Sequence, residues 1–338
     1  MVSLMYSNKF QLFILSIVTA LLCNDVFAAE LRLNPEHVEG PVACGECHKK
    51  SVESWKKTHH ATSFKSLPRS EEARSIAKKM GIKRIKADGD CLTCHFTSKT
   101  VEEKVDQIAA VSCESCHGAG KNWIDIHSDF GGKDMKAENE DPAHKKERYK
   151  NSEEAGMIRP SNLYALAENC YQCHTVPNER LVNEGGHAAG SAFELVRWSQ
   201  GEVRHNVWYS DGNSEASLER KRLMFVIGKA LDLEYSLRGV AKATSPEKYA
   251  KEMAGRANKA RKQVAAIAKR VQLPEIDRMV EISSAVKLKL NNEAALVEAA
   301  DAISAQAKSF AQNYDGSEFS TVDDVLPSAD RYKGNVTQ

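Results

Sequence analysis

The chain has 338 residues, and its 47 Lys and Arg residues nearly balance its 46 Asp and Glu residues, which gives a formal net charge of +1. A charge this close to zero gives no reason to expect a nucleic acid or another polyanion as a partner. The nine cysteines are more informative, because eight of them occur in pairs of fixed spacing.

Residues 1–28 have the pattern of a cleavable secretory signal peptide. Lys9 supplies a positive start, residues 10–22 are apolar, and Val26-Phe27-Ala28 resembles a small-residue cleavage site. The apolar run is too short and too poorly flanked for a membrane span, and no later segment is long and apolar enough for one. We expect cleavage after Ala28, which removes Cys23, and a mature protein that is soluble in the periplasm.

Four copies of Cys-x-x-Cys-His use all eight remaining cysteines. In this signature of c-type haem attachment, the two thiols form thioethers to the porphyrin vinyl groups and the histidine ligates the iron from the proximal side. The sequence therefore predicts four covalently bound haems. The predicted attachment residues are Cys44, Cys47, Cys91, Cys94, Cys113, Cys116, Cys170 and Cys173, and the predicted proximal ligands are His48, His95, His117 and His174.

Two other uses of paired cysteines compete with haem attachment. The pairs that begin at Cys91 and Cys113 have the spacing of a zinc ribbon. Eight cysteines in an exported protein could also form four disulfides. Neither alternative explains why a histidine directly follows the second cysteine of every pair, whereas haem attachment does.

Residues 29–211 are predicted to form the tetrahaem domain. The motifs begin at residues 44, 91, 113 and 170, which is too uneven a spacing for a tandem repeat. About 180 residues for four haems leave little protein core, so the porphyrin rings are expected to serve as the core. Helices are predicted around residues 51–57 and 70–80, with loops that wrap the rings.

Residues 212–315 have the periodicity of long helices. Apolar residues recur in steps of three and four from Val226 to Val240, from Tyr249 to Val271 and from Leu296 to Phe310. The expected fold is therefore mainly α. It consists of a haem-packed multihaem domain with little regular sheet, followed by a bundle or hairpin of long helices.

The boundaries of these helices follow from capping residues. Ser245-Pro246 is expected to start the second helix, Pro274 a third that continues to Leu290, and Asn292 to cap a fourth. The apolar stripes either pack within the chain or form a homo-oligomer or partner interface with heptad-like seams. Residues 316–338 lack periodicity and are expected to form a loose tail.

Each haem iron has a second axial position, and the group that fills it distinguishes an electron carrier from a catalyst. Methionines 80, 135 and 157 could ligate iron, but methionine more often serves in packing. Seven histidines outside the motifs suffice to make every iron bis-histidine with three left over. They are His37, His59, His60, His127, His144, His187 and His205.

Two segments resemble the cytochrome c-554 family of periplasmic tetrahaem cytochromes. The segment 54–61, Ser-Trp-Lys-Lys-Thr-His-His-Ala, is similar to the family's Trp-…-His-Ala segment, and residues 111–120, followed by His127, are similar to its third motif. In the family, the corresponding histidines are distal haem ligands, which implies that role for His60 and His127. The resemblance covers residues 40–210 and does not extend to the C-terminal helices.

The late histidines depart from the family pattern. The family has one late distal ligand, for which His205 is the better match by position, and its second-motif haem is five-coordinate with an open face. His187 is then left for the remaining haem, which is the one that His95 ligates. This chain thus has two late candidates where the family needs one.

Three functional hypotheses follow. The first is a periplasmic carrier that passes electrons between a donor and an acceptor redox protein through closely spaced, mostly bis-histidine haems. The second is a haem enzyme that reduces or oxidises NO, nitrite or hydroxylamine at a five-coordinate haem on His95. The third is a subunit whose C-terminal helices dock a catalytic partner. The absence of a Cys-x-x-Cys-Lys variant favours the carrier.

Overall fold

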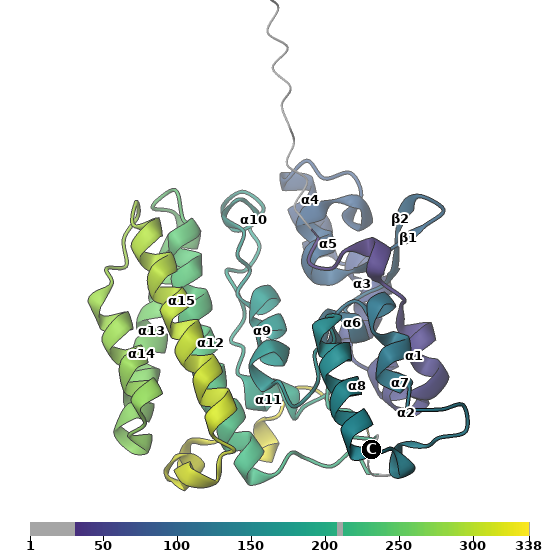
Figure 1. Ribbon diagram of the computed structural model, residues 1–338. Helices are drawn as coiled ribbons and strands as arrows, with labels where there is room; N and C mark the ends of the chain where they lie inside the picture. The colour runs from purple at the N-terminus through teal and green to yellow at the C-terminus, as the bar shows by residue number, and fades with distance from the viewer. Residues whose placement is uncertain (1–30, 208–211, 338) are drawn as a thin grey trace, which may run out of the picture.

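A computed structural model describes residues 31–207 and 212–337, and these ranges form a mainly α protein, as the sequence predicts. Long helices pack side by side in one half of the molecule, and short helices with a small hairpin make up the other (Figure 1). The expected signal peptide, residues 1–28, lies outside the described residues. Within the described ranges, no helix combines the length and apolar character that a bilayer span requires.

The half that contains the four motifs is built from short elements. Its helices are α1 Pro41–Cys47, α2 Lys49–Lys56, α3 His59–Ser66, α4 Glu71–Lys79, α5 Gly89–His95, α6 Cys113–His117, α7 Ile124–Ser128, α8 Pro142–Glu154, α9 Leu163–His174, α10 Glu179–Asn183 and α11 Leu195–Ser199. Strands β1 Thr97–Val101 and β2 Lys104–Ala109 pair antiparallel across a turn in which Glu102 and Glu103 both have positive φ. Two positive φ values are typical of the turn that matches the twist of a tight hairpin.

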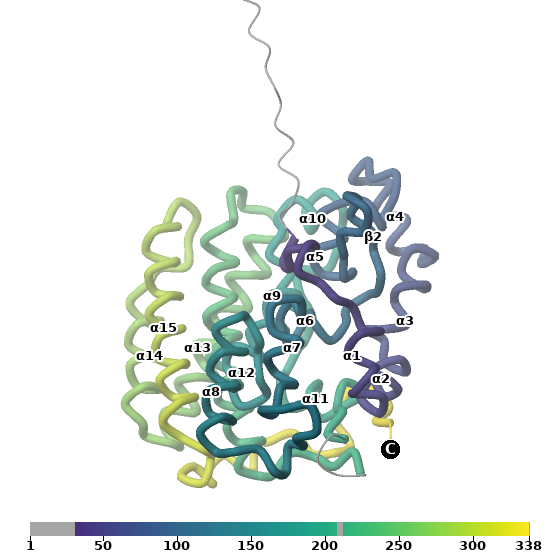
Figure 2. Tube along the Cα trace, turned by 45° about the vertical axis from the view of Figure 1, so that its right-hand side comes forward, coloured from purple at the N-terminus to yellow at the C-terminus, as the bar shows by residue number. Residues whose placement is uncertain are grey.

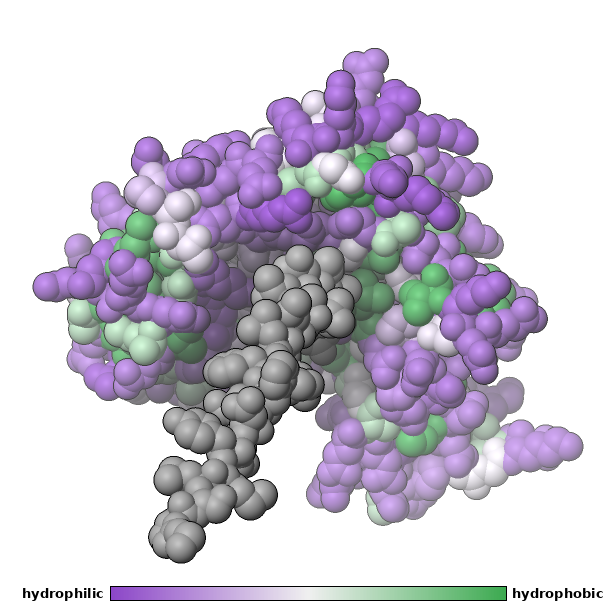
Figure 3. Space-filling model, turned by 90° about the horizontal axis from the view of Figure 1, so that it is seen from above, coloured by the Kyte–Doolittle hydropathy of each residue, from purple (hydrophilic) through white to green (hydrophobic). Residues whose placement is uncertain are grey.

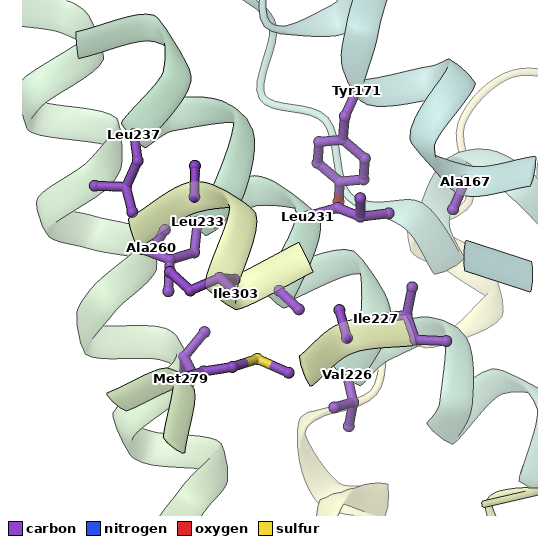
Figure 4. Packing of buried hydrophobic residues seen from close by; sticks show 14 of the residues in the cluster. Ala167, Tyr171, Val226, Ile227, Leu231, Leu233, Leu237, Ala260, Met279 and Ile303 are labelled. Carbon is purple, nitrogen blue, oxygen red and sulfur yellow. The ribbon is translucent and has the colours of Figure 1, made fainter. Parts of the chain in front are cut away.

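The second half is a bundle of four long helices. They are α12 Leu218–Lys242, α13 Lys248–Val271, α14 Pro274–Ala285 and α15 Glu293–Asn313. The three predicted apolar stripes face inward, so that Leu237, Met253 and Ile303, for example, are fully buried (Figure 4). The stripes therefore pack against one another within the chain.

Two helix boundaries differ from the predicted ones. Helix α13 begins at Lys248 instead of Ser245, because the hydroxyl and backbone N–H of Ser245 donate to the Glu179 carboxylate instead of capping the helix. Helix α14 ends at Ala285, five residues before Leu290, which nevertheless packs against the bundle core from the following loop.

The bundle core does not stop at residue 211 but continues into the helix that carries the fourth motif. Figure 4 shows Ala167 and Tyr171 of α9 directed toward Ile227 and Leu231 of α12, and all four are at most 1% exposed. Tyr164 of α9 adds a buried hydrogen bond of 2.6 Å to the Glu234 carboxylate of α12. The fourth motif is thus anchored on the bundle.

The C-terminal segment 316–338 is packed within its described part, where the sequence predicts a loose tail. Phe319 and Val322 are buried at 1% and 0% exposure, and Arg222 of α12 forms a two-bond ion pair with Asp323. The Lys333 N–H donates to the Arg197 carbonyl. Phe319, Val322 and Asp323 belong to a 3₁₀ run, Ser317–Val325, which lacks the 3.6-residue periodicity that reveals an α-helix in a sequence.

Gly228 marks the closest approach of α12 to the motif half. A Cβ at this position would lie 2.9 Å from Cβ of Leu195 and 3.2 Å from the Tyr171 hydroxyl. We expect Gly228→Ala to destabilise the protein by about 1–3 kcal/mol, because overpacking forces these neighbours apart. Denaturation followed by circular dichroism measures the change.

Gly255 of α13 provides a matched control. A Cβ there meets nothing within 4 Å, so Gly255→Ala should stabilise the helix by about 0.5–1 kcal/mol. Equal effects of the two substitutions would contradict the close packing of α9 and α11 against α12.

Candidate haem-binding site

Each Cys-x-x-Cys-His sequence lies at the C-terminal end of a helix. The motifs end α5, α6 and α9, and the first motif ends α1 with His48 as its C-cap residue. Residues i, i+3 and i+4 share one face of a helix, so each local fold presents two thiols and an imidazole on the same side. Figures 1 and 2 show α5, α6 and α9 close together near the centre of the molecule.

Each motif histidine faces one other histidine from a distant part of the chain. The paired rings are separated, centroid to centroid, by 6.3 Å for His48–His127, 6.4 Å for His95–His187, 6.2 Å for His117–His205 and 6.3 Å for His174–His60. These four partners are the four distal candidates of the sequence analysis. The structure therefore brings together each motif with one candidate, and no candidate is shared.

The ring separation matches the dimension that a metal between two imidazoles imposes. A metal–nitrogen bond is about 2.0–2.1 Å long, and a five-membered ring with bonds of about 1.33 Å has a radius of about 1.1 Å. Two such ligands on opposite sides of one iron place their ring centroids about 6.3 Å apart. All four pairs lie within 0.1 Å of this value.

Hydrogen bonds at Nδ1 prepare several of these imidazoles for ligation through Nε2. Nδ1 of His187, His205 and His117 donates to the carbonyls of Ala188, Val203 and Ile158 at 2.8, 2.8 and 2.9 Å. His127 donates in the same way to the Ile124 carbonyl, and Nδ1 of His174 bonds to the Ser191 hydroxyl. With the proton held at Nδ1, the Nε2 lone pair is free, as it is in metal-ligating histidines.

Burial keeps most of these rings neutral. It lowers the pKa of His95 and of His174 to about 4, and it also lowers the pKa of His48, His60, His117 and His127. Only a neutral imidazole can donate its lone pair to a metal. These histidines are therefore in their ligating form at neutral pH.

The eight motif cysteines are free thiols, and the described residues contain no cluster of three or more His, Cys, Asp or Glu side chains that could hold a metal ion. Thiol hydrogen bonds pair Cys44 with Cys113 and Cys94 with Cys173. The first motif thus lies next to the third, and the second next to the fourth.

Two buried donors have no partner among the described residues and fit a haem. The Trp123 Nε1–H is buried in a side chain that packs edge-on against the His127 ring at 5.1 Å. The Arg204 Nε–H is buried next to His205. A buried donor without an acceptor is costly, and haem propionates are acceptors that could satisfy both.

The other histidines outside the motifs differ from the four facing ones in their described contacts. His59 is 88% exposed on its side chain and pairs with Glu202 at 2.7 Å. His144 pairs with Glu140 at 2.8 Å. Met80 is buried and Met135 exposed. A cavity of about 810 Å³ is bordered by α3 and β2, and none of the motif residues or their facing histidines lines it.

An ion-pair cluster that the sequence analysis did not identify holds His127 in place. Arg148 of α8 donates to the His127 carbonyl at 2.6 Å and forms a bidentate pair with Glu140, and both side chains are at most 7% exposed. The hydrogen bond from Arg148 is the largest of the effects that lower the pKa of Glu140 to about 2. In the sequence these are ordinary charged residues, so no local signal distinguishes them.

The bundle and the C-terminal segment position the later candidates. Arg256 of α13 donates to the Ser191 carbonyl at 3.1 Å and pairs with Asp232, and Ser191 in turn contacts His174. Glu202, which precedes His205 by three residues, donates its backbone N–H to the Lys333 carbonyl. The loops that carry late histidines are thus tied to regions outside the predicted haem domain.

A mainly α fold in which four helices carry this motif at their C-terminal ends is the arrangement expected of a c-type cytochrome. Residues 43–118 match the family described as cytochrome c554 and c-prime. A cytochrome c-554 from Nitrosomonas europaea is 31% identical over 144 residues, which are 40% of this chain and 57% of that relative. Part of the chain is thus similar to the cytochrome c-554 family, and the chain spans just over half the length of that relative. No solved structure matches it significantly.

Replacement of Arg148 tests the support of His127. Arg148→Met leaves the buried Glu140 carboxylate with His144 as its remaining partner. Breaking a buried ion pair costs about 3–5 kcal/mol, and we expect a loss of this order in the free energy of unfolding at pH 7. Arg278→Met is the control, because Arg278 pairs with Glu281 on the surface and its loss should cost less than about 1 kcal/mol.

The difference between wild type and Arg148→Met should depend on pH. Because the pKa of Glu140 is lowered from 4.5 to about 2, its contribution to stability is full above pH 4.5 and declines as the pH falls toward 2. The two proteins should therefore become more alike in acid. A difference that stayed constant from pH 7 to pH 2 would contradict the ion pair.

Proposed function

We propose that the protein is a periplasmic tetrahaem electron carrier in which every iron has two histidine ligands. The proposal rests on the four histidine pairs, whose centroid separations of 6.2–6.4 Å suit one iron between each pair. The motif cysteines would hold the four porphyrins through thioethers. The predicted signal peptide supports a periplasmic location.

The residues around each iron suit electron transfer better than substrate chemistry. Haem, when bound, supplies a one-electron ferric–ferrous couple. The paired histidines would hold the iron from both sides, and the Nδ1 hydrogen bonds of His187, His205 and His117 fix the orientation of these rings, so little rearrangement would accompany a change of charge. The thiol contacts Cys44–Cys113 and Cys94–Cys173 place neighbouring attachment sites side by side, which favours electron hopping between them.

His187 argues against the enzymatic alternative. An enzyme of this type needs a five-coordinate iron, and the family resemblance points to the haem on His95 for that role. Here His187 faces His95 at 6.4 Å, with its Nδ1 held by the Ala188 carbonyl. An imidazole in this position would occupy the site that NO, nitrite or hydroxylamine needs.

The partners are proposed to be a donor and an acceptor redox protein. Docking or homo-oligomerisation through the apolar seams has little support, because those seams are buried within the bundle. Among the described residues, the exposed large hydrophobic side chains lie outside α13, α14 and α15. Hydrophilic side chains dominate the face in Figure 3, with hydrophobic ones in small groups.

The first test is an EPR spectrum of the fully oxidised mature protein, with the spins counted against haem content. Four haems per chain, all low-spin, are expected, because each iron has two strong-field imidazole ligands. A high-spin signal from one iron in four would contradict the bis-histidine assignment and favour the enzymatic alternative.

Distal-ligand variants test the individual pairs. His187→Gly and His60→Gly should each convert one low-spin iron to a high-spin iron that binds cyanide, because each removes one axial ligand. His59→Gln is the matched control for His60, since His59 is its sequence neighbour and is exposed. If His187→Gly stayed fully low-spin and bound no cyanide, another group would have to be the ligand of the His95 iron.

A further inference from the structure

A single arginine lies where three of the four motifs meet. Nη1 of Arg32 donates to the Asn169 carbonyl at 3.0 Å and to the Gln172 side chain at 3.1 Å, and Nη2 donates to the Ser115 carbonyl. Gln172 and Ser115 are interior residues of the fourth and third motifs. Arg32 also lines a narrow cleft together with Cys94 of the second motif. The guanidinium therefore contacts or borders motifs two, three and four.

The positive charge of Arg32 acts on the attachment cysteines. The two carbonyls that its guanidinium contacts belong to Asn169 and Ser115, the residues directly before Cys170 and Cys116. Its hydrogen bonds fix the charge in position, with carbonyl and amide oxygens as partners and no carboxylate among them. Within the described ranges, the cation is thus held close to the motif cysteines without a hydrogen-bonded counter-ion.

A buried carboxylate occupies the corresponding position near the first motif. Glu114, the second residue of the third motif, is 1% exposed. Its oxygens accept from the backbone N–H groups of Glu39, Gly40 and Gly120 at 2.8, 2.8 and 2.7 Å. Three backbone donors thus satisfy the hydrogen-bonding needs of this buried side chain. This charge lies next to the thiols of Cys44 and Cys113 and acts on both.

We propose that Arg32 and Glu114 polarise the haem array, so that the fourth-motif haem has the higher reduction potential and the first-motif haem the lower. The inference rests on the proposed tetrahaem function. Ferric haem carries one more positive charge than ferrous haem, so a fixed cation favours the ferrous state and a fixed anion the ferric state. Arg32 and Glu114 therefore act on the haem potentials through their charges, and neither is proposed as an iron ligand.

This polarity gives electron flow a direction. A donor protein would pass one electron to the ferric first-motif haem, and the electron would move through the adjacent third motif to the haems near Arg32. An acceptor protein would remove it there, and no covalent bond changes in any step. The third motif, in contact with both charges, is the link between the two ends.

Other charged residues near the motifs determine at which haem the removal of Arg32 should change the potential most. Asp88 and Asp90 act on Cys91 and oppose Arg32 at the second motif, although Arg180 partly compensates Asp90 at 3.7 Å. Glu39 adds to the negative charge near Cys44, while Lys99 pairs with Glu39 at 3.1 Å. The fourth motif, whose residues Arg32 contacts directly, should therefore respond most to its removal.

The test is a redox titration of holoprotein variants, from which four midpoint potentials are fitted. Arg32→Gln should lower the highest potentials, with a change on the order of tenfold in the ferric–ferrous equilibrium, or about 59 mV for a one-electron couple. Arg32→Lys keeps the charge and should retain most of the wild-type value. Glu114→Gln should raise the lowest potentials, so both charge-removing variants should narrow the spread among the four.

Haem content and low-spin count, measured on each variant, separate this inference from the proposed function. Fewer than four low-spin haems in the wild type would contradict the proposed function, whatever the potentials. If four low-spin haems are present, two results would overturn the proposed order of potentials. One is a spread of the four midpoint potentials in Arg32→Gln that is unchanged or wider than in the wild type. The other is a shift of the potentials in Arg32→Lys that equals the shift in Arg32→Gln. If Glu114→Gln does not fold, the comparison of the two Arg32 variants decides alone.

Discussion

The distance between facing histidine rings is the constraint on which the rest of the structure depends. A pair of imidazoles can share one iron only near a centroid separation of about 6.3 Å, and an error of 1 Å would break a bond. Helix ends fix one ring of each pair, while the facing rings come from a first helical turn, a short helix and two loops. The contacts of Arg148, Arg256 and Lys333 hold the segments that carry or adjoin these facing rings.

The distribution of the hydrophobic core follows from the same constraint. The large core cluster lies in the bundle and in α9 to α11, whereas the second cluster, in the motif half, contains only Ala77, Ile85, Leu92 and Phe96 as buried members. A domain whose interior is given to large cofactors has few positions for apolar side chains. The bundle supplies what is missing, because it anchors the fourth motif on a conventional core.

Sequence patterns predicted the regular parts of this protein well. The apolar stripes of the bundle and the helical setting of the motifs follow from local periodicity and spacing, and the candidates His60, His127, His187 and His205 are the histidines that face the motifs. Which candidate faces which motif could not be predicted for His60, because its partner His174 is separated from it by two other motifs.

The features that the sequence did not reveal depend on contacts between distant residues. Glu179 draws Ser245 away from a capping role, and Asp323 holds the C-terminal segment through Arg222, although neither carboxylate lies near its partner in the chain. A charged residue has the same local appearance whether it is solvated or buried in an ion pair. Only the fold determines which of the two environments it has.

Under the proposed ligation, the histidine pairs also act as cross-links. Each iron would join two points of the backbone that are separated by about 80 to 115 residues, which closes long loops much as a disulfide does. The loops overlap, because His60 and His174 enclose the second and third motifs. No loop could be opened alone without strain on its neighbours, so the chain should resist local unfolding in the motif half despite its small apolar core there. In this protein, the groups that carry electrons would also be the ones that hold the backbone together.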